Sequence, residues 1–76
     1  MVTKFDSNKF GIRIRIERLI ERKISLRAAA DEIGISNATL NRYELSKGIP
    51  DLISYAKVCD WLDVEIDTFF NVKLEE

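Results

Sequence analysis

The chain is expected to be all-α, on the evidence of its apolar pattern and its few turn-forming residues. Apolar residues recur at helical spacing along most of the 76 positions. Three glycines and one proline are too few for a loop-rich or β fold, and the apolar fraction of 46% is ordinary for a globular chain. We therefore expect one small domain over residues 1–76, with its core at about 8–71, a short N-terminal arm and a C-terminal tail.

The first helix is expected from about Asn8 to Lys23, with Ser7 or Asn8 accepting hydrogen bonds from the free N–H groups of its first turn. The alternation over residues 12–16 could also indicate a strand, but it does not continue, so a helix is favoured. Ile14 lies off the apolar stripe that we expect to face the core. That stripe consists of Ile12, Ile16, Leu19 and Ile20.

The next two helices are expected to follow each other closely. Ser25 can cap a second helix, and Gly34 can end it by adopting the left-handed conformation. Ser36, two residues later, can cap a third helix over about residues 36–45. Two helices joined by three or four residues that include a glycine cross at a steep angle, which is the geometry of a helix-turn-helix.

The last third of the chain is expected to hold two more helices. A loop over residues 45–50 leads to Asp51, which can cap a fourth helix that ends at about Leu62. A short fifth helix is expected over 66–71, followed by a tail over 72–76 that frays. The expected inward face of the fourth helix consists of Leu52, Tyr55, Ala56, Cys59 and Leu62.

The composition excludes several functional classes. Cys59 is the sole cysteine and there is no histidine, so we expect neither an internal disulfide nor a zinc or thiol–imidazole site. No apolar stretch approaches the roughly 20 residues that span a bilayer, and the N-terminus lacks a signal-peptide pattern. We therefore expect a cytoplasmic protein that is not an enzyme, with no metal, cofactor, small-molecule ligand or membrane partner.

The net charge of −1 conceals an uneven distribution. Residues 1–50 carry ten Lys and Arg against six Asp and Glu, a balance of +4, whereas residues 51–76 carry two against seven, a balance of −5. A polyanion would therefore meet a positive first half.

The third helix carries an unusual number of hydrogen-bonding side chains. A helix that enters the DNA major groove must bury its back, for which Leu40 is suited, and point bonding groups outward. Asparagine can pair with adenine and arginine with guanine, while alanine or a threonine methyl can contact thymine. The residues near the helix N-terminus usually read the bases. The expected base-reading residues are Asn37, Ala38, Thr39, Asn41 and Arg42.

The two helix N-termini of this motif are expected to contact the DNA backbone. At Ser25 and Ser36, free N–H groups and a partial positive charge suit phosphate. Lys23, Arg27 and Lys47 can add charge at the same surface. Such contacts position a protein on DNA but carry no sequence information.

Residues 24–50 resemble the Cro and phage-repressor type of helix-turn-helix family, often called XRE-like. The resemblance extends to Asp67, and it implies a compact five-helix, lambda-repressor-like domain. It also implies a sequence-specific double-stranded DNA-binding transcriptional regulator, a repressor of bacterial or phage type, that binds a two-fold operator as a homodimer. The matching segments are Ile24-Ser25, Ala30, Ile33-Gly34-Ile35-Ser36, Thr39-Leu40, Arg42-Tyr43-Glu44, Lys47 and Pro50.

The resemblance further implies an ion pair between an arginine on the first helix and Glu44 at the end of the third. Arg18 is the candidate, with Arg15 in reserve, because the segment before Ile24 holds one extra residue relative to the family.

Three positions depart from the family pattern. Leu26 stands where the family commonly has a phosphate-contacting glutamine, so only its backbone N–H remains for phosphate. Leu45-Ser46 follow the third helix where the family often has glycine, and Asp63 ends the fourth helix where glycine is usual. Aspartate tolerates the left-handed conformation better than most residues.

Large apolar residues near the C-terminus admit two interpretations: they complete the core, or some of them contact a second copy of the chain. The candidates for the dimer contact are Trp61, Phe69, Phe70, Val72 and Leu74. Two alternatives to a transcriptional regulator remain. One is an antitoxin, which binds both DNA and a toxin, and the other is a protein-interaction module that retains the fold without binding DNA.

Overall fold

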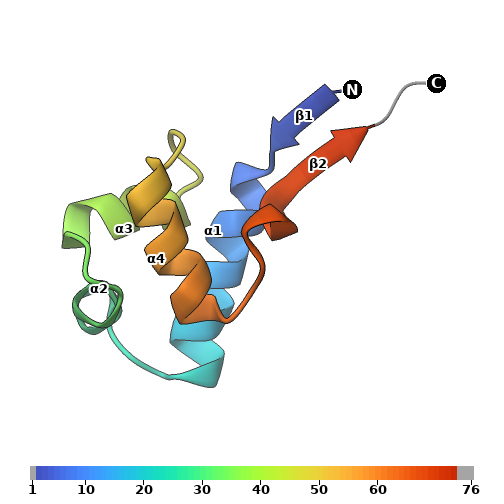
Figure 1. Cartoon of the computed structure of the whole chain (residues 1–76). Coiled ribbons are helices and arrows are strands. Elements are labelled where there is room, and N and C mark those ends of the chain that lie inside the picture. The colour runs from blue at the N-terminus through green and yellow to red at the C-terminus, as the bar shows by residue number, and fades with distance from the viewer. Residues whose placement is uncertain (1, 74–76) are drawn as a thin grey trace.

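Four α-helices and a two-stranded ribbon make up residues 2–73, the part of the chain that the computed structural model describes (Figure 1). The helices pack around one core, and the ribbon points away from them (Figure 1). The all-α class is confirmed, although the fifth helix is a single 3-10 turn. No helix within residues 2–73 combines the length and apolarity needed to cross a bilayer. In chain order the elements are β1 (Val2–Phe5), α1 (Ser7–Ile16), the π-helical turn η1 (Glu17–Glu21), α2 (Leu26–Ile33), α3 (Asn37–Glu44), α4 (Leu52–Leu62), the 3-10 helix η2 (Ile66–Phe69) and β2 (Phe70–Lys73).

The helix α1 begins earlier than predicted. Its cap is Asp6 rather than Ser7 or Asn8, because Asp6 Oδ1 accepts the backbone N–H of Lys9 at 3.0 Å. A carboxylate is as effective a cap as a hydroxyl, so Asp6 can take this role one residue before the predicted candidates.

The turn η1 continues α1 with a wider helical turn. The N–H of Arg22 donates to the carbonyl of Glu17 at 2.8 Å, which is the i to i+5 bond of a π turn. Lys23 follows with a φ of 54°, and the N–H of Ile24 then donates back to the carbonyl of Arg18 at 2.9 Å. Since a π turn holds one residue more than an α turn, this segment accommodates the extra residue inferred before Ile24.

The face of α1 that meets the core is not the predicted one. Phe10 and Ile14 are buried, whereas every residue of the predicted stripe is exposed, so that prediction is wrong. The isoleucines alternate over residues 12–16 and therefore mark two opposite faces of one helix. Packing against α3 selects the face that carries Phe10 and Ile14. The residues left exposed are Ile12, Ile16, Leu19 and Ile20.

Gly11 permits the close packing of α1 on α3. A Cβ atom added at Gly11 would lie 2.6 Å from the carbonyl oxygen of Tyr43 and 3.1 Å from that of Glu44. Both oxygens belong to the backbone at the end of α3, which cannot yield as a flexible side chain would. The position of the end of α3 therefore depends on the missing side chain at Gly11.

The predicted caps of the other helices are present. The side chains of Ser25, Ser36 and Asp51 each accept the N–H three residues further on, at 3.1, 3.1 and 2.8 Å. Gly34 ends α2 with a φ of 90°, and Asp63 ends α4 with a φ of 58°. These local hydrogen bonds and left-handed residues fix the helix boundaries.

The two ends of the described chain pair with each other, which the sequence did not indicate. Strand β2 lies antiparallel to β1, with Phe5 opposite Phe70. The predicted helix over 66–71 is therefore wrong beyond Phe69, and residues 72 and 73 of the tail that was expected to fray belong to β2. Both strands are only four residues long, and their pairing is non-local. An aromatic cluster anchors the ribbon to the helices, with centroid distances of 5.4–5.8 Å among the rings of Phe5, Phe10, Tyr55 and Phe70.

The C-terminal aromatic residues complete the core. Trp61 and Phe69 are buried, so they do not offer the dimer surface considered for them. Phe70 is half-buried against the aromatic cluster, and Leu74 lies outside the described residues. Val72 lies in β2. Leu52, expected on the inner face of α4, is instead one of the most exposed apolar residues, because Tyr55, Val58, Cys59 and Leu62 define that face.

Candidate nucleic-acid interface

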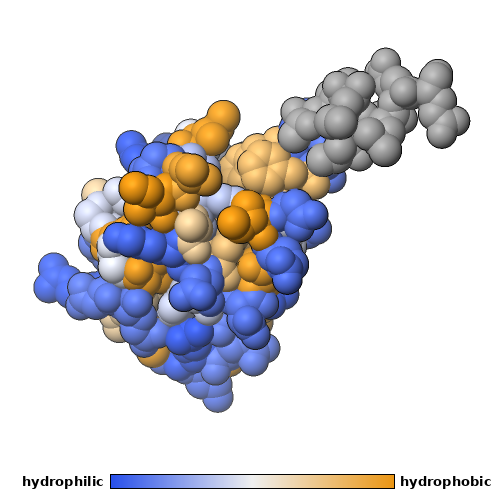
Figure 2. All heavy atoms as spheres, in the orientation of Figure 1, coloured by the Kyte–Doolittle hydropathy of each residue, from blue (hydrophilic) through white to orange (hydrophobic). Residues whose placement is uncertain are grey.

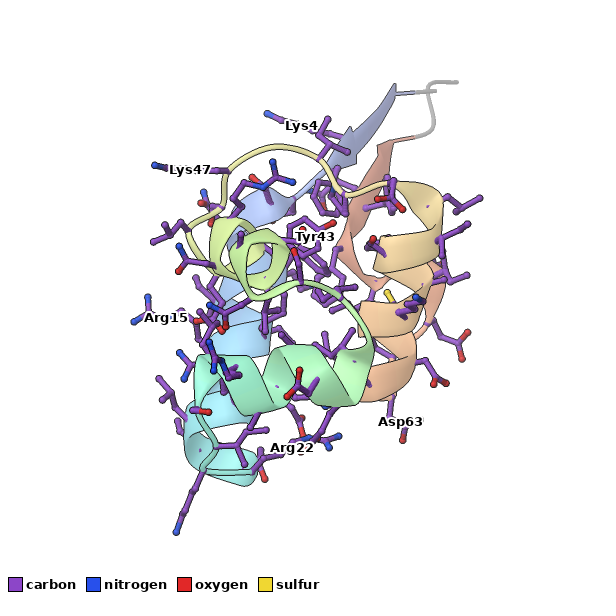
Figure 3. All side chains as sticks on the ribbon, turned by 90° about the vertical axis from the view of Figure 1, so that its left-hand side faces the viewer. Lys4, Arg15, Arg22, Tyr43, Lys47 and Asp63 are labelled. Carbon is purple, nitrogen blue, oxygen red and sulfur yellow. The ribbon has the colours of Figure 1, made fainter. Side chains whose placement is uncertain are left out.

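The helices α2 and α3 form a tight helix-turn-helix. The backbone N–H of Gly34 donates to the carbonyl oxygen of Ala30 at 2.8 Å, and the N–H of Ile35 donates to the same oxygen at 3.1 Å. Ile35 packs on the core, and Ser36 then caps α3. Because Gly34 takes the left-handed conformation, the chain turns sharply enough for Ser36, the cap of α3, to follow two residues later. Figure 3 looks onto the side of the molecule that carries both helices.

The helix α3 has a buried back and a polar front. Leu40 is fully buried and Tyr43 nearly so, whereas Asn37, Asn41 and Arg42 are exposed. The single carboxylate of the helix, Glu44, points inward and is buried. The outward surface of α3 therefore presents amide, methyl and guanidinium groups without a negative charge. Of the five predicted base-reading residues, four are exposed and one, Thr39, is half-buried.

Thr39 takes part in the cap of α3. The hydroxyl of Ser36 accepts the backbone N–H of Thr39 at 3.1 Å and donates to Thr39 Oγ1 at 2.7 Å. This arrangement fixes the Thr39 rotamer at the start of the helix. The Thr39 hydroxyl hydrogen is not used in this bond and remains able to donate outward, as does the Thr39 methyl group to contact an apolar atom.

The predicted phosphate-contacting residues lie around the same two helices. Ser25 and Ser36 occupy the two N-caps, and Lys23 and Arg27 are exposed near the start of α2. Lys47 projects from the loop after α3 (Figure 3). These cations and helix N-termini belong to α2, α3 and the segments next to them, as expected for contacts with a sugar–phosphate backbone.

Leu26 occupies a hydrophobic position instead of a polar one. Its side chain is half-buried and packs against the core at the first turn of α2. The position therefore contributes to packing, and only its backbone N–H can face a phosphate. At the two positions where the family has glycine, this chain still adopts the left-handed conformation. Ser46 has a φ of 60° after α3, and Asp63 has a φ of 58° after α4.

An ion pair links the first helical segment to the end of α3. Arg18 Nε donates to Glu44 Oε2 at 2.7 Å, and Arg18 Nη2 donates to Glu44 Oε1 at 2.9 Å. Arg18 Nη1 also donates to the carbonyl of Ile24 at 3.3 Å. The hydrogen bonds to the Glu44 carboxylate raise the pKa of Arg18, so the guanidinium remains charged. The structure thus pairs Arg18, and not Arg15, with Glu44, and this bidentate geometry fixes the orientation of α3.

Arg22 is a second anchoring residue, which the sequence analysis did not identify. Its guanidinium donates to Glu17 at 2.9 Å, to Glu32 at 2.8 Å and to the carbonyl of Trp61 at 2.9 Å. It also lies 4.5 Å from the centre of the Trp61 ring, and Trp61 Nε1 donates to Glu32 at 3.0 Å. Arg22 therefore connects η1, α2 and α4. Its partners are up to 39 residues away, so no local pattern marks it.

The fold and this surface define the class. A short helix with a buried back and a polar front without negative charge, joined by a tight glycine turn to a preceding helix and accompanied by exposed cations, is a helix-turn-helix DNA-binding domain. The family model described as helix-turn-helix, HTH_3, matches residues 14–69. The chain therefore belongs to the HTH_3 family, which confirms the XRE-like family inferred from residues 24–50.

The solved structures that resemble this one include two bacterial regulatory proteins. An HTH_3 family transcriptional regulator from Vibrio cholerae has a TM-score of 0.67 and 23% identity, and the match covers 84% of this chain and 35% of that one. This chain thus spans about a third of the length of that regulator. The restriction-modification controller protein C.AhdI from Aeromonas hydrophila has a TM-score of 0.66 and 26% identity, over 80% of this chain and 91% of that one. No curated protein matches significantly.

Proposed function

We propose that this protein is a sequence-specific double-stranded DNA-binding regulator that acts as a transcriptional repressor in the cytoplasm. The observation that carries the proposal is the polar front of α3, which lacks negative charge, stands on a buried back and is fixed by the ion pair between Arg18 and Glu44. The similar proteins support it, since one is described as a transcriptional regulator and the other as a restriction-modification controller.

In the proposed complex, α3 enters the major groove and α2 lies across the backbone. Asn37, Ala38 and Thr39 near the start of α3 read base edges, with Arg42 one turn further on and Asn41 beside them. The two helix N-termini and the cations around them, chiefly Lys47 and Arg27, contact phosphates.

The proposal includes a homodimer, because an operator with two-fold symmetry needs two recognition helices. Since Trp61 and Phe69 are buried, we place the contact at the start of α4. Ile49, Leu52 and Ile53 are all strongly exposed there, in the segment that directly follows α3. Figure 2 shows hydrophobic side chains gathered on this side of the molecule. Burial of these side chains between two copies would bring both α3 helices to one face of the duplex.

Selection of bound sequences from a random duplex pool tests specificity and symmetry together. The expected result is a palindromic site whose half-sites lie about 34 Å apart, one helical turn. Sedimentation should show a dimer that Leu52→Glu dissociates. Binding should weaken log-linearly with salt, because phosphate contacts release counterions. A flat salt response, or no binding at low salt, would favour the interaction module over the regulator.

Two substitutions separate base reading from phosphate binding. Asn37→Ala should cost about 1–3 kcal/mol on the selected site and relax the preference at one base position. Lys47→Ala should weaken binding to all duplexes alike and lower the salt slope by about one. Equal losses on selected and scrambled duplexes for Asn37→Ala would remove that residue from the base-reading set.

A further inference from the structure

The outer face of α1 and η1 carries an apolar stripe that nothing in the described chain covers. The exposed fractions are 56% for Ile12, 40% for Ile16, 49% for Leu19 and 62% for Ile20. A few isolated exposed aliphatic residues are normal on any protein, but four in one row on one helix form a contiguous patch. Neither the core nor the DNA-binding surface uses these side chains.

The stripe lies in grooves rather than on a flat surface. A groove of about 540 Å³ runs between α1 and η2, with Ile12 and Ile16 on one wall and Val64 and Phe69 on the other. A second groove of about 250 Å³ continues along Ile12, Ile16, Leu19 and Ile20. Ridges of side chains on one helix pack into grooves of this kind on another. The shape therefore suits a helix more than it suits the flat surface of a bilayer.

Cations lie along both grooves. Lys9 and Arg13 line the larger groove and Arg15 lines the smaller one. Within residues 4–71, neither Arg13 nor Arg15 takes part in a salt bridge. The one carboxylate in the lining, Asp6, already accepts the N–H of Lys9 as the cap of α1. A third hollow adjoins Arg13 and Ile16 and is lined by three carboxylates: Glu17 is bound by Arg22, whereas Glu21 and Asp63 form no salt bridge within residues 4–71.

This charge distribution distinguishes between possible occupants. A two-fold contact centred on Ile16 would bring Arg15 of one copy close to Arg15 of the other, which is unfavourable. A helix with carboxylates beside its apolar residues would instead give Arg13 and Arg15 the partners that they lack. Arg15 is also directed so that a bound helix could reach it. In Figure 3 it projects sideways from α1, away from α4, while α2 and α3 face the viewer.

We propose that the face of α1 and η1 is the docking site for an acidic amphipathic helix of a second protein. The apolar residues of that helix occupy the grooves along Ile12, Ile16, Leu19 and Ile20, and its Asp or Glu residues pair with Arg13 and Arg15. Since this face and the helix-turn-helix point in different directions, the partner can bind while α3 is on DNA. The proposal does not depend on DNA binding.

A displayed library of amphipathic helices of about 18 residues, five turns long, tests the proposal with the full chain as bait. One face of each helix is apolar, and the flanking positions vary between Glu and Lys. The peptides that are enriched should be rich in Glu, and their affinity should fall as the salt concentration rises, because exposed ion pairs are screened. Absence of enrichment, or winners rich in Lys, would overturn the proposal.

Variants of the bait locate the site. Ile16→Gln should weaken the selected peptide about tenfold, which corresponds to about 1.4 kcal/mol. Ile12→Gln serves as an independent second variant, and both positions are exposed enough to change without loss of the fold. Ile66→Gln, an equally exposed isoleucine outside both grooves, is the matched control and should change the affinity less than twofold. Equal losses in all three variants would contradict the assignment.

Two further measurements address the other occupants. If the chain self-associates in sedimentation and Ile16→Gln abolishes that association, the occupant is a second copy and the proposal is wrong. If vesicles rich in phosphatidylserine bind the chain and Ile16→Gln releases it, the face is a membrane surface and the proposal is again wrong. We expect neither effect. Replacement of Arg13 and Arg15 by Gln should remove the preference for Glu-rich over Lys-rich peptides.

Discussion

Removal of the Glu44 charge should destabilise the fold far more than removal of a similar charge at the surface. Glu44 and Arg18 share two hydrogen bonds, and their side chains are only 7% and 15% exposed. Glu44→Gln leaves the Arg18 guanidinium largely out of water without its counter-charge. Breaking a buried pair by removing one partner costs about 3–5 kcal/mol, and the residual exposure of Arg18 places our expectation at about 3 kcal/mol.

The matched control is the pair formed by Glu17 and Arg22 on the same helical segment. Its carboxylate is 16% exposed and lies at a similar distance of 2.9 Å, but the Arg22 side chain is 35% exposed and also pairs with Glu32. Because Arg22 would keep Glu32 and its access to water, Glu17→Gln should cost about 1 kcal/mol or less. Urea unfolding followed by circular dichroism measures both values. A domain of this size has a free energy of unfolding of roughly 4–11 kcal/mol, so both variants should remain measurable.

A double replacement tests the reasoning more strictly. Arg18→Met combined with Glu44→Leu removes both charges and keeps the space filled, so the unfolding free energy should return to within about 1–2 kcal/mol of the unmodified protein. If Glu44→Gln and Glu17→Gln proved equally costly, burial would not set the strength of this pair. Arg18→Met and Glu44→Leu are also measured singly. If the double variant lost as much stability as these two single variants together, the ion pair would not be the origin of the cost.

Three other predictions concern the same fold. Gly11→Ala should destabilise the protein by about 1–3 kcal/mol in urea unfolding, although alanine favours helices, because the new methyl group would meet the backbone of α3 at 2.6 Å; a stabilised variant would contradict this packing. Ser36→Ala should cost about 1 kcal/mol through loss of the α3 cap, whereas Ser36→Asp should retain most of the stability. Burial raises the pKa of Cys59 above 9.0 and the pKa of Tyr55 above 10.0, so the native state binds these protons more tightly than the unfolded chain does. The unfolding free energy should therefore fall as the pH rises past these values, and Cys59→Ala should reduce the slope near pH 9; a pH-independent stability over pH 8–11 would refute the assignment.

The parts of the fold that depend on local chemistry were predictable from the sequence. A short polar side chain can bond to the N–H group three residues further on, which makes caps such as Ser25, Ser36 and Asp51 predictable. The turn residue Gly34 is predictable because glycine readily takes the left-handed conformation. The identity of the helix-turn-helix followed from the same few positions. Interactions of short range leave a pattern that a single sequence can reveal.

The parts that depend on distant segments were not predictable. Two faces of α1 carried isoleucines, and only contact with α3 decides that the face with Phe10 and Ile14 is inside. The partners of Arg22 come from three elements, and the strands pair residues near opposite ends of the chain. The family resemblance narrows the arginine that pairs with Glu44 to Arg18 or Arg15. The π turn that places Arg18 opposite Glu44 has no recognised sequence signal.

The pairing of β1 with β2 has a consequence for how this molecule assembles and opens. The helical body can form from contacts between neighbouring segments, whereas the ribbon closes a loop of nearly the whole chain, from Phe5 to Phe70. Closure of so long a loop is entropically costly and becomes favourable only when the helices have already brought both ends together. The ribbon is thus the final element to form and the first to exchange its amide hydrogens, and strain applied to either terminus is relieved there before the recognition helix is disturbed.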